Sequence, residues 1–168
     1  YFGFQAVFED FDNDGWPDIF VGNDSNPNYF YRNNRDGTFT QAAGLFVPRT
    51  PVSSMGADLG DVTNDGRIDF FVADMATTTH EKDQRGMADT RGTAKDPTPE
   101  RPAIAPQVPH NTLFINSGTG RYLEGAFLAG IAATDWTWAT RLEDLDNDGR
   151  LDRPGFARPR NLVHRFVR

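Results

Sequence analysis

Two short motifs recur along this chain at a common spacing, and this internal repetition limits what the chain can fold into. An acidic loop followed by an apolar run begins at Asp10, again at Asp61 and again at Asp144. A second motif, NYFYRNNRDGTF from Asn28, aligns without gaps with NTLFINSGTGRY from Asn111, and each copy starts 33 residues before the next acidic loop. Because the two motifs keep one register, the sequence predicts a repeated unit of 51 residues, whose second copy carries 32 more.

Each unit is predicted to contain four short β-strands. The 68–72 run is apolar on both faces, which is typical of a strand between two neighbouring sheets. Four strands in a unit of this length are typical of a propeller blade. The sequence therefore predicts an all-β fold, a partial β-propeller of about two to three four-stranded blades with a proline-rich insertion. In the second unit the predicted strands are residues 55–60, 69–73, 112–115 and 121–124.

The repeat region is expected to span residues 1–152, with its loops at 10–18, 61–69 and 144–152. The extra residues lie within 77–110, which holds five of the chain's 11 prolines and is predicted to be a surface insertion. This insertion is either a binding or lid loop or a solvated segment without a role of its own. Residues 153–168 form an arginine-rich tail, interpreted as a reading-frame error, a truncated end or a basic arm.

The distribution of charge favours a cation as partner and argues against nucleic acid. The formal net charge is −7, and the last 19 residues alone carry +5, so the preceding 149 carry −12. Phosphate recognition requires a basic face, which this acidic body does not offer. No apolar run is long enough to cross a bilayer, so no membrane insertion is expected, and no signal peptide is visible.

The acidic loops have the composition of a calcium site. Their pattern is Asp-x-Asp/Thr-Asn-Asp-Gly-x-x-Asp, and the glycine at position 6 permits a sharp turn that brings positions 1, 3, 5 and 9 together. The carbonyl of position 7 can point inward as a further ligand. About six oxygens, most of them charged, suit Ca²⁺ better than Mg²⁺, so two to three Ca²⁺ ions are predicted. The predicted ligand positions are Asp10, Asp12, Asp14, Trp16 and Asp18; Asp61, Thr63, Asp65, Arg67 and Asp69; and Asp144, Asp146, Asp148, Arg150 and Asp152.

Position 12 separates these loops from helix-flanked calcium loops. An EF-hand requires Glu there and related loops require Asp, whereas these loops have Val21, Val72 and Gly155. The alternative that remains open is an Asx-rich turn whose side chains cap their own backbone without a metal. The second loop is expected to bind calcium more weakly than the first, because Thr63 replaces a carboxylate and ligand charge tunes affinity.

These residues resemble the FG-GAP/VCBS repeat family, whose calcium-loop blades also form the head of integrin α chains. The resemblance is carried by the acidic loop followed by Asp-Ile-Phe-Val or Asp-Phe-Phe-Val, and it covers residues 1–152 outside the insertion. The stretch 106–152 is similar to a bacterial branch allied to cartilage acidic protein, often with an ASPIC/UnbV domain downstream. The resemblance implies a larger propeller in the complete protein, calcium in the loops, and adhesion or binding outside the cell or at its surface.

The expected function is non-catalytic: a calcium-binding propeller segment that serves as an extracellular or cell-surface binding or adhesion module. Its expected partners are a protein or glycan ligand on the propeller face and further blades, since so few blades cannot close a ring. The alternative is an accessory part of a secreted carbohydrate-active enzyme, a lyase or hydrolase, whose active residues lie on other blades. Trp136 and Trp138 could form a sugar platform, but alternation predicts that they share one strand face and pack inside a blade.

Overall fold

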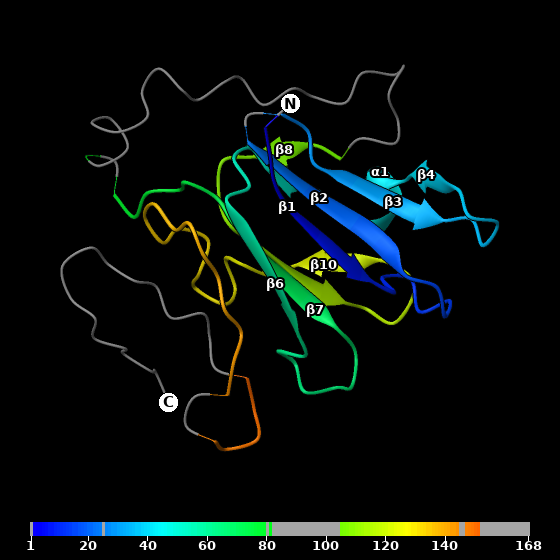
Figure 1. The fold of residues 1–168 in the computed structure, drawn as a ribbon. Helices are drawn as coiled ribbons and strands as arrows, with labels where there is room; N and C mark the ends of the chain where they lie inside the picture. The colour runs from blue at the N-terminus through cyan, green and yellow to red at the C-terminus, as the bar shows by residue number, and fades with distance from the viewer. Residues whose placement is uncertain (1, 25, 80, 82–104, 145–146, 152–168) are drawn as a thin grey trace.

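Two four-stranded antiparallel sheets lie side by side in the chain (Figure 1). The strand order is β1-β2-β3-β4 in the first sheet, called blade 1, and β6-β7-β9-β10 in the second, called blade 2. The all-β prediction, with four strands in each of the first two units and a partial propeller, is therefore confirmed. The computed structural model describes residues 2–24, 26–79, 81, 105–144 and 147–151.

Blade 1 is a meander in which each strand pairs with the next. The first acidic loop connects β1 to β2, and the pair formed by Glu9 and Asp18 closes it. The hairpin between β3 and β4 contains the second repeated motif. The strands of blade 1 are β1 (Phe2–Glu9), β2 (Asp18–Asp24), β3 (Tyr29–Asn33) and β4 (Phe39–Gln41).

Blade 2 repeats this plan, and its strands agree with the predicted ranges to within one residue. Gly60 pairs with Asp69 and closes the second acidic loop, as the equivalent pair does in blade 1. All five residues of β7 are buried, as expected for a strand with a packed layer on each face. The strands of blade 2 are β6 (Gly56–Gly60), β7 (Asp69–Ala73), β9 (Thr112–Asn116) and β10 (Tyr122–Glu124).

A cluster of phenylalanine rings fills the space between the two blades. Phe20 and Phe30 of blade 1 face Phe70 of blade 2 across this core, at centroid distances of 5.6 Å from the Phe70 ring. The Phe70 ring also lies 4.4 Å from that of Phe114 and 5.3 Å from that of Phe11. All five rings are at most 1% exposed. Tilted and edge-on contacts at these distances are favourable for aromatic pairs, so Phe70 is the centre of the core.

Side chains also join the neighbouring inner strands of successive units. The Gln5 side chain donates from Nε2 to the carbonyl of Ala57 (2.7 Å) and accepts at Oε1 from its N–H (2.6 Å), which links β1 to β6. On the far side of blade 2, the N–H of Leu142 donates to Oδ2 of Asp58 (2.6 Å). Leu142 packs there with Phe71 in a second apolar cluster. The beginning of the third unit therefore covers the outer face of blade 2.

The end of the predicted surface insertion lies inside the molecule. β5 (Thr50–Pro51) pairs in parallel with β8 (Gln107–Val108), so the chain returns to the blade interface after residue 104. Ala105 is buried in the core between the blades, and the surface character predicted for 77–110 does not extend to it. The helix α1 (Ala43–Phe46) is one short turn, and the described part of the chain contains no helix suited to crossing a membrane. Most of the insertion and the tail at 153–168 lie outside the described residues.

Trp136 and Trp138 do not pack inside a blade, so this prediction is wrong. Their side chains are 46% and 56% exposed, while Thr137 between them is buried. The predicted strand is also absent, because the described residues after β10 form none. Asp135 explains the difference, because its φ of 61° makes a turn there and its carboxylate accepts hydrogen bonds from the N–H and hydroxyl of Thr78.

Candidate metal centre in the acidic loops

The three acidic loops share one backbone conformation wherever they are described. Positions 4 and 6 both adopt the left-handed conformation, which glycine reaches without strain and asparagine tolerates. This requirement explains why Asn-Asp-Gly recurs in every copy. The residues are Asn13, Asn64 and Asn147, with φ of 58°, 59° and 59°, and Gly15, Gly66 and Gly149, with φ of 88°, 82° and 84°.

The carboxylate at position 1 ties each turn together. Asp10 accepts the N–H of Asp14 at Oδ1 (2.9 Å) and the N–H of Gly15 at Oδ2 (2.7 Å). Asp61 and Asp144 accept the equivalent pairs of bonds at 2.7–3.0 Å. The side-chain capping of the Asx-turn alternative is therefore present. It does not exclude a metal, because a carboxylate has about four lone-pair sites and these bonds use two.

In the first two loops the aspartate at position 9 is buried and held by the third strand of its blade. Asp18 accepts the N–H of Asn33 at Oδ1 (2.8 Å), and Asp69 accepts the N–H of Asn116 at the same distance. The other oxygen of Asp18 accepts the N–H of Phe11 (3.2 Å). The two asparagines were not singled out as site residues in the sequence, although the gapless alignment of the second motif places them at equivalent positions.

Three carboxylates converge in the first loop. One oxygen from each of Asp10, Asp12 and Asp18 lies within 4.8 Å of the others. Two oxygens bound to one Ca²⁺ at 2.3–2.6 Å can be up to about 5 Å apart, so this spacing fits a calcium shell. Asp12 adds a second observation, because its side chain is only 10% exposed and its buried Oδ1 has no hydrogen-bond partner in the described part of the chain. A buried carboxylate oxygen without a partner is costly unless a cation binds it.

Burial and neighbouring charge disfavour the ionised forms of these carboxyls. Burial raises the pKa of Asp18 to about 6, and the charges of Asp12 and Asp14 act in the same direction, although the N–H of Asn33 opposes them. Burial and then the charge of Asp14 raise the pKa of Asp12. Burial also raises the pKa of Asp69 in the second loop. A bound divalent ion would favour the ionised form at each position and so offset both causes.

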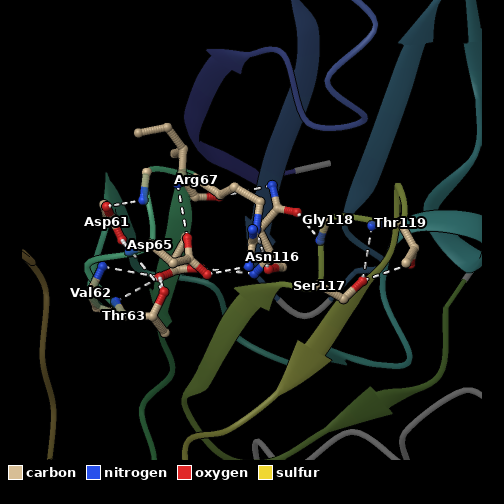
Figure 2. Close-up of polar contacts among 12 residues, drawn as sticks. Asp61, Val62, Thr63, Asp65, Arg67, Asn116, Ser117, Gly118 and Thr119 are labelled. Atoms are coloured by element: carbon tan, nitrogen blue, oxygen red, sulfur yellow. Dashed lines mark hydrogen bonds and ion pairs between the residues drawn. The ribbon is translucent and has the colours of Figure 1, made fainter.

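Position 5 lies outside the converging group. Asp14 accepts the N–H of Trp16 at Oδ1 (3.0 Å), and its Oδ2 forms an ion pair with Arg35 (2.6 Å), which lowers the pKa of Asp14. In the second loop, Asp65 accepts the N–H of Arg67 (3.0 Å) and pairs with the same arginine's guanidinium (Figure 2). Whether position 5 and the carbonyl of position 7 bind the ion stays a prediction.

The second loop offers fewer charged oxygens than the first. The hydroxyl of Thr63 stands at position 3, 3.3 Å from Oδ2 of Asp69 and 3.5 Å from Oδ1 of Asp61 (Figure 2). Among the described residues, a group of three acidic side chains suited to a metal occurs in the first loop alone. In the third loop Asp146 and Asp152 lie outside the described residues, so the convergence of its ligands stays a prediction.

The comparisons with known proteins bear on the first two loops. A comparison with curated proteins found no match. Residues 10–72, from the start of the first acidic loop to β7, match the family model described as an FG-GAP-like repeat. The matched range comprises the first acidic loop, β2, β3 and β4 of blade 1, and the β6–β7 hairpin of blade 2 as far as Val72, and it supports a resemblance of this part of the chain to FG-GAP repeats.

Proposed function

We propose that this chain is a calcium-stabilised segment of a β-propeller and serves as a non-catalytic binding or adhesion module outside the cell. The observation that carries the calcium part is the first loop, where three carboxylates converge and Oδ1 of Asp12 is buried without a partner. The FG-GAP-like match supports a propeller-type binding module. Calcium would neutralise the repulsion among these carboxylates and fix the connection between the two inner strands of the blade.

Millimolar Ca²⁺ is expected to raise the melting temperature of the chain by about 5–10 °C over its value in chelator. The estimate follows from about 2.7 kcal/mol of linkage at a concentration 100 times the dissociation constant, and 2–4 °C for each kcal/mol in a chain of this size. Asp12→Asn should reduce this shift because it removes a charged ligand. Asp36→Asn, which changes an exposed aspartate outside the loops, should leave it unchanged. Identical melting curves in chelator and calcium would contradict the proposal.

We also propose that a further blade is the structural partner of blade 1. Phe8 pairs with Ile19, and Ile19 pairs with Tyr31, so the three side chains share the sheet face that points away from blade 2. Phe8 is 64% exposed. In blade 2 the residues 51 positions after Phe8 and Ile19 are Leu59 and Phe70, and the residue 83 positions after Tyr31 is Phe114. These three equivalent residues pack against blade 1. The exposed face of blade 1 is therefore equivalent to the face of blade 2 that packs against blade 1.

Without that partner, the 168-residue chain is expected to self-associate through this face, since a contiguous exposed apolar patch favours association. Phe8→Glu should weaken the association at least about tenfold, measured by sedimentation across a concentration series. Leu45→Glu is the matched control, because Leu45 has a similar exposed fraction but lies in α1. Equal weakening by both substitutions would indicate a general charge effect and argue against the proposed face.

The location and lineage belong to the same proposal. Calcium sites of modest affinity fill where calcium is abundant, which favours the extracellular space or the cell surface. The resemblance of residues 106–152 favours the bacterial branch that often carries an ASPIC/UnbV domain. A protein or glycan ligand on the propeller face is the partner that this function requires, and binding of immobilised glycans or extracellular proteins by the calcium-loaded chain would test it.

A further inference from the structure

Arginine side chains from the third strand and its hairpin neutralise part of the first acidic loop. Arg32, on β3, contacts Asp12 Oδ2 with Nε at 2.8 Å and lies 3.7 Å from Oδ2 of Asp14 through Nη2. Arg35, in the β3–β4 hairpin, donates from Nε (3.2 Å) and Nη2 (2.6 Å) to that same oxygen of Asp14. The side chains of Asp12 and Asp14 are about nine-tenths buried, whereas those of Arg32 and Arg35 are about half exposed.

In blade 2 the carboxylate at position 5 also pairs with an arginine, but that arginine comes from a different place in the sequence. Its hairpin has Gly118 where the hairpin of blade 1 has Arg35, so that source of charge is missing. Arg67 replaces it from position 7 of the loop itself: its guanidinium pairs with Asp65 and its Nε donates to the carbonyl of Asn116 (3.2 Å) (Figure 2). A Cβ on Gly118 would stand 3.4–3.5 Å from the Arg67 side chain, which is ordinary van der Waals contact, so this guanidinium lies directly against the hairpin. Two independent solutions thus place an arginine on the position-5 carboxylate.

We propose that Arg32, Arg35 and Arg67 are internal counter-cations that set the calcium affinity of their loops. In the absence of an ion they stabilise the loop by opposing the repulsion among its carboxylates. When calcium binds, they remain nearby and repel it, which lowers the affinity. In the first loop the two roles are compatible, because Arg32 occupies Oδ2 of Asp12 and leaves the buried Oδ1 open. This inference rests on the proposed function, since it takes Ca²⁺ as the ion.

The arginines also change the expected ranking of the loops. Counting carboxylates alone favours the first loop, which has four against three in the second. The first loop pairs with two arginines and the second with one. The formal charge of the carboxylates and their paired arginines together is therefore −2 in each loop. The two native loops are therefore expected to differ less in affinity than the carboxylate count implies. Removing the arginines of the first loop should restore the difference.

Terbium luminescence excited at the red edge of the tryptophan band, where tyrosine absorbs little, can report on the first loop selectively, because Trp16 stands at position 7 there and arginine stands at that position in the other two loops. Calcium displaces Tb³⁺ and so gives the calcium dissociation constant of that loop, and Trp16→Phe should abolish the signal. In Arg32→Gln/Arg35→Gln, the dissociation constant is expected to fall about tenfold, the size of a screened repulsion between a divalent ion and nearby guanidiniums. The melting temperature of this variant in chelator should fall by about 2–4 °C.

The double variant is expected to bind calcium more tightly and yet to melt at a lower temperature in chelator. If the arginines only supported the loop structure, their removal would weaken both calcium binding and stability. Arg35→Lys, which keeps the charge, should behave as the native chain does in calcium affinity, and Arg49→Gln, at an exposed site between α1 and β5, should change neither readout. If the native chain binds calcium and the double variant binds it equally or less tightly, the counter-cation proposal is overturned while the calcium function stands. If neither binds calcium, both are overturned. If the double variant alone binds, the arginine proposal is supported and native calcium binding at this loop is rejected.

Discussion

Replacing Phe70 with alanine is expected to lower the free energy of unfolding by about 3–5 kcal/mol, the usual cost of removing a buried phenylalanine ring. The ring of Phe70 lies between the two blades, in contact with rings from both. Its loss would therefore leave a cavity at the blade interface, where relaxation of either sheet is limited by its own hydrogen bonds. Chemical denaturation of the full chain in calcium measures the change.

Two further variants make the Phe70 result interpretable. Phe39→Ala is the matched control, because Phe39 is substantially exposed on β4 and its truncation should cost less than about 1 kcal/mol. Phe70→Leu keeps most of the apolar volume and should fall between the two, which guards against an alanine variant too unstable to measure. A loss below about 1 kcal/mol in Phe70→Ala would show that the two blades do not depend on a shared core.

Asn111→Ala is expected to cost about 3–5 kcal/mol, although it removes no large apolar group. The buried amide of Asn111 accepts the N–H of Asp74 (2.7 Å) and donates to the carbonyl of Ile131 (2.8 Å) and the hydroxyl of Thr134 (2.6 Å). Alanine would remove this partner from the N–H of Asp74 and the carbonyl of Ile131, at about 1–3 kcal/mol for each, whereas the hydroxyl of Thr134 keeps its contact with that of Thr137 (3.0 Å). The amide joins the end of β7 to residues 131–134 after β10, so its loss also frees that connection from blade 2.

The equivalent asparagine in blade 1 allows an internal test of this prediction. Asn28 accepts the N–H of Asn23 (2.7 Å) and donates to the carbonyl of Pro51 and the hydroxyl of Ser54 (3.1 and 2.7 Å). Asn28→Ala should therefore have a cost similar to that of Asn111→Ala, measured by the same denaturation. Asn34→Ala, at an exposed position in the β3–β4 hairpin, should change stability by less than about 1 kcal/mol. A small effect at both buried asparagines would mean that water replaces their amides.

The strands and loop turns were predictable because both depend on local rules. A short apolar run that follows a turn indicates a strand over a few positions, and the 69–73 strand was predicted with the bounds that β7 has. Asn-Asp-Gly likewise predicts a tight turn, because few residues tolerate a left-handed backbone. The repetition of both signals at spacings of 51 and 83 residues then indicated blades rather than a single sheet.

The partners of polar side chains depended instead on packing between distant segments. The exposure of Trp136 and Trp138 was predicted wrongly because a turn at Asp135 decides which side of the segment faces inward. The arginine partner of the position-5 carboxylate could not be read from the loops, since it comes from the hairpin in blade 1 and from position 7 in blade 2. A long flexible side chain can reach several acceptors, and only the folded arrangement of the strands selects one.

Repetition and turn chemistry in the chain were thus sufficient to establish two blades with acidic loops of one shape. The three-dimensional packing established which carboxylates meet, which asparagines bridge the units and which arginines oppose the loop charge. The physical reason is range: backbone conformation responds to neighbours within a few residues, whereas charge and burial depend on groups brought together from positions tens of residues apart.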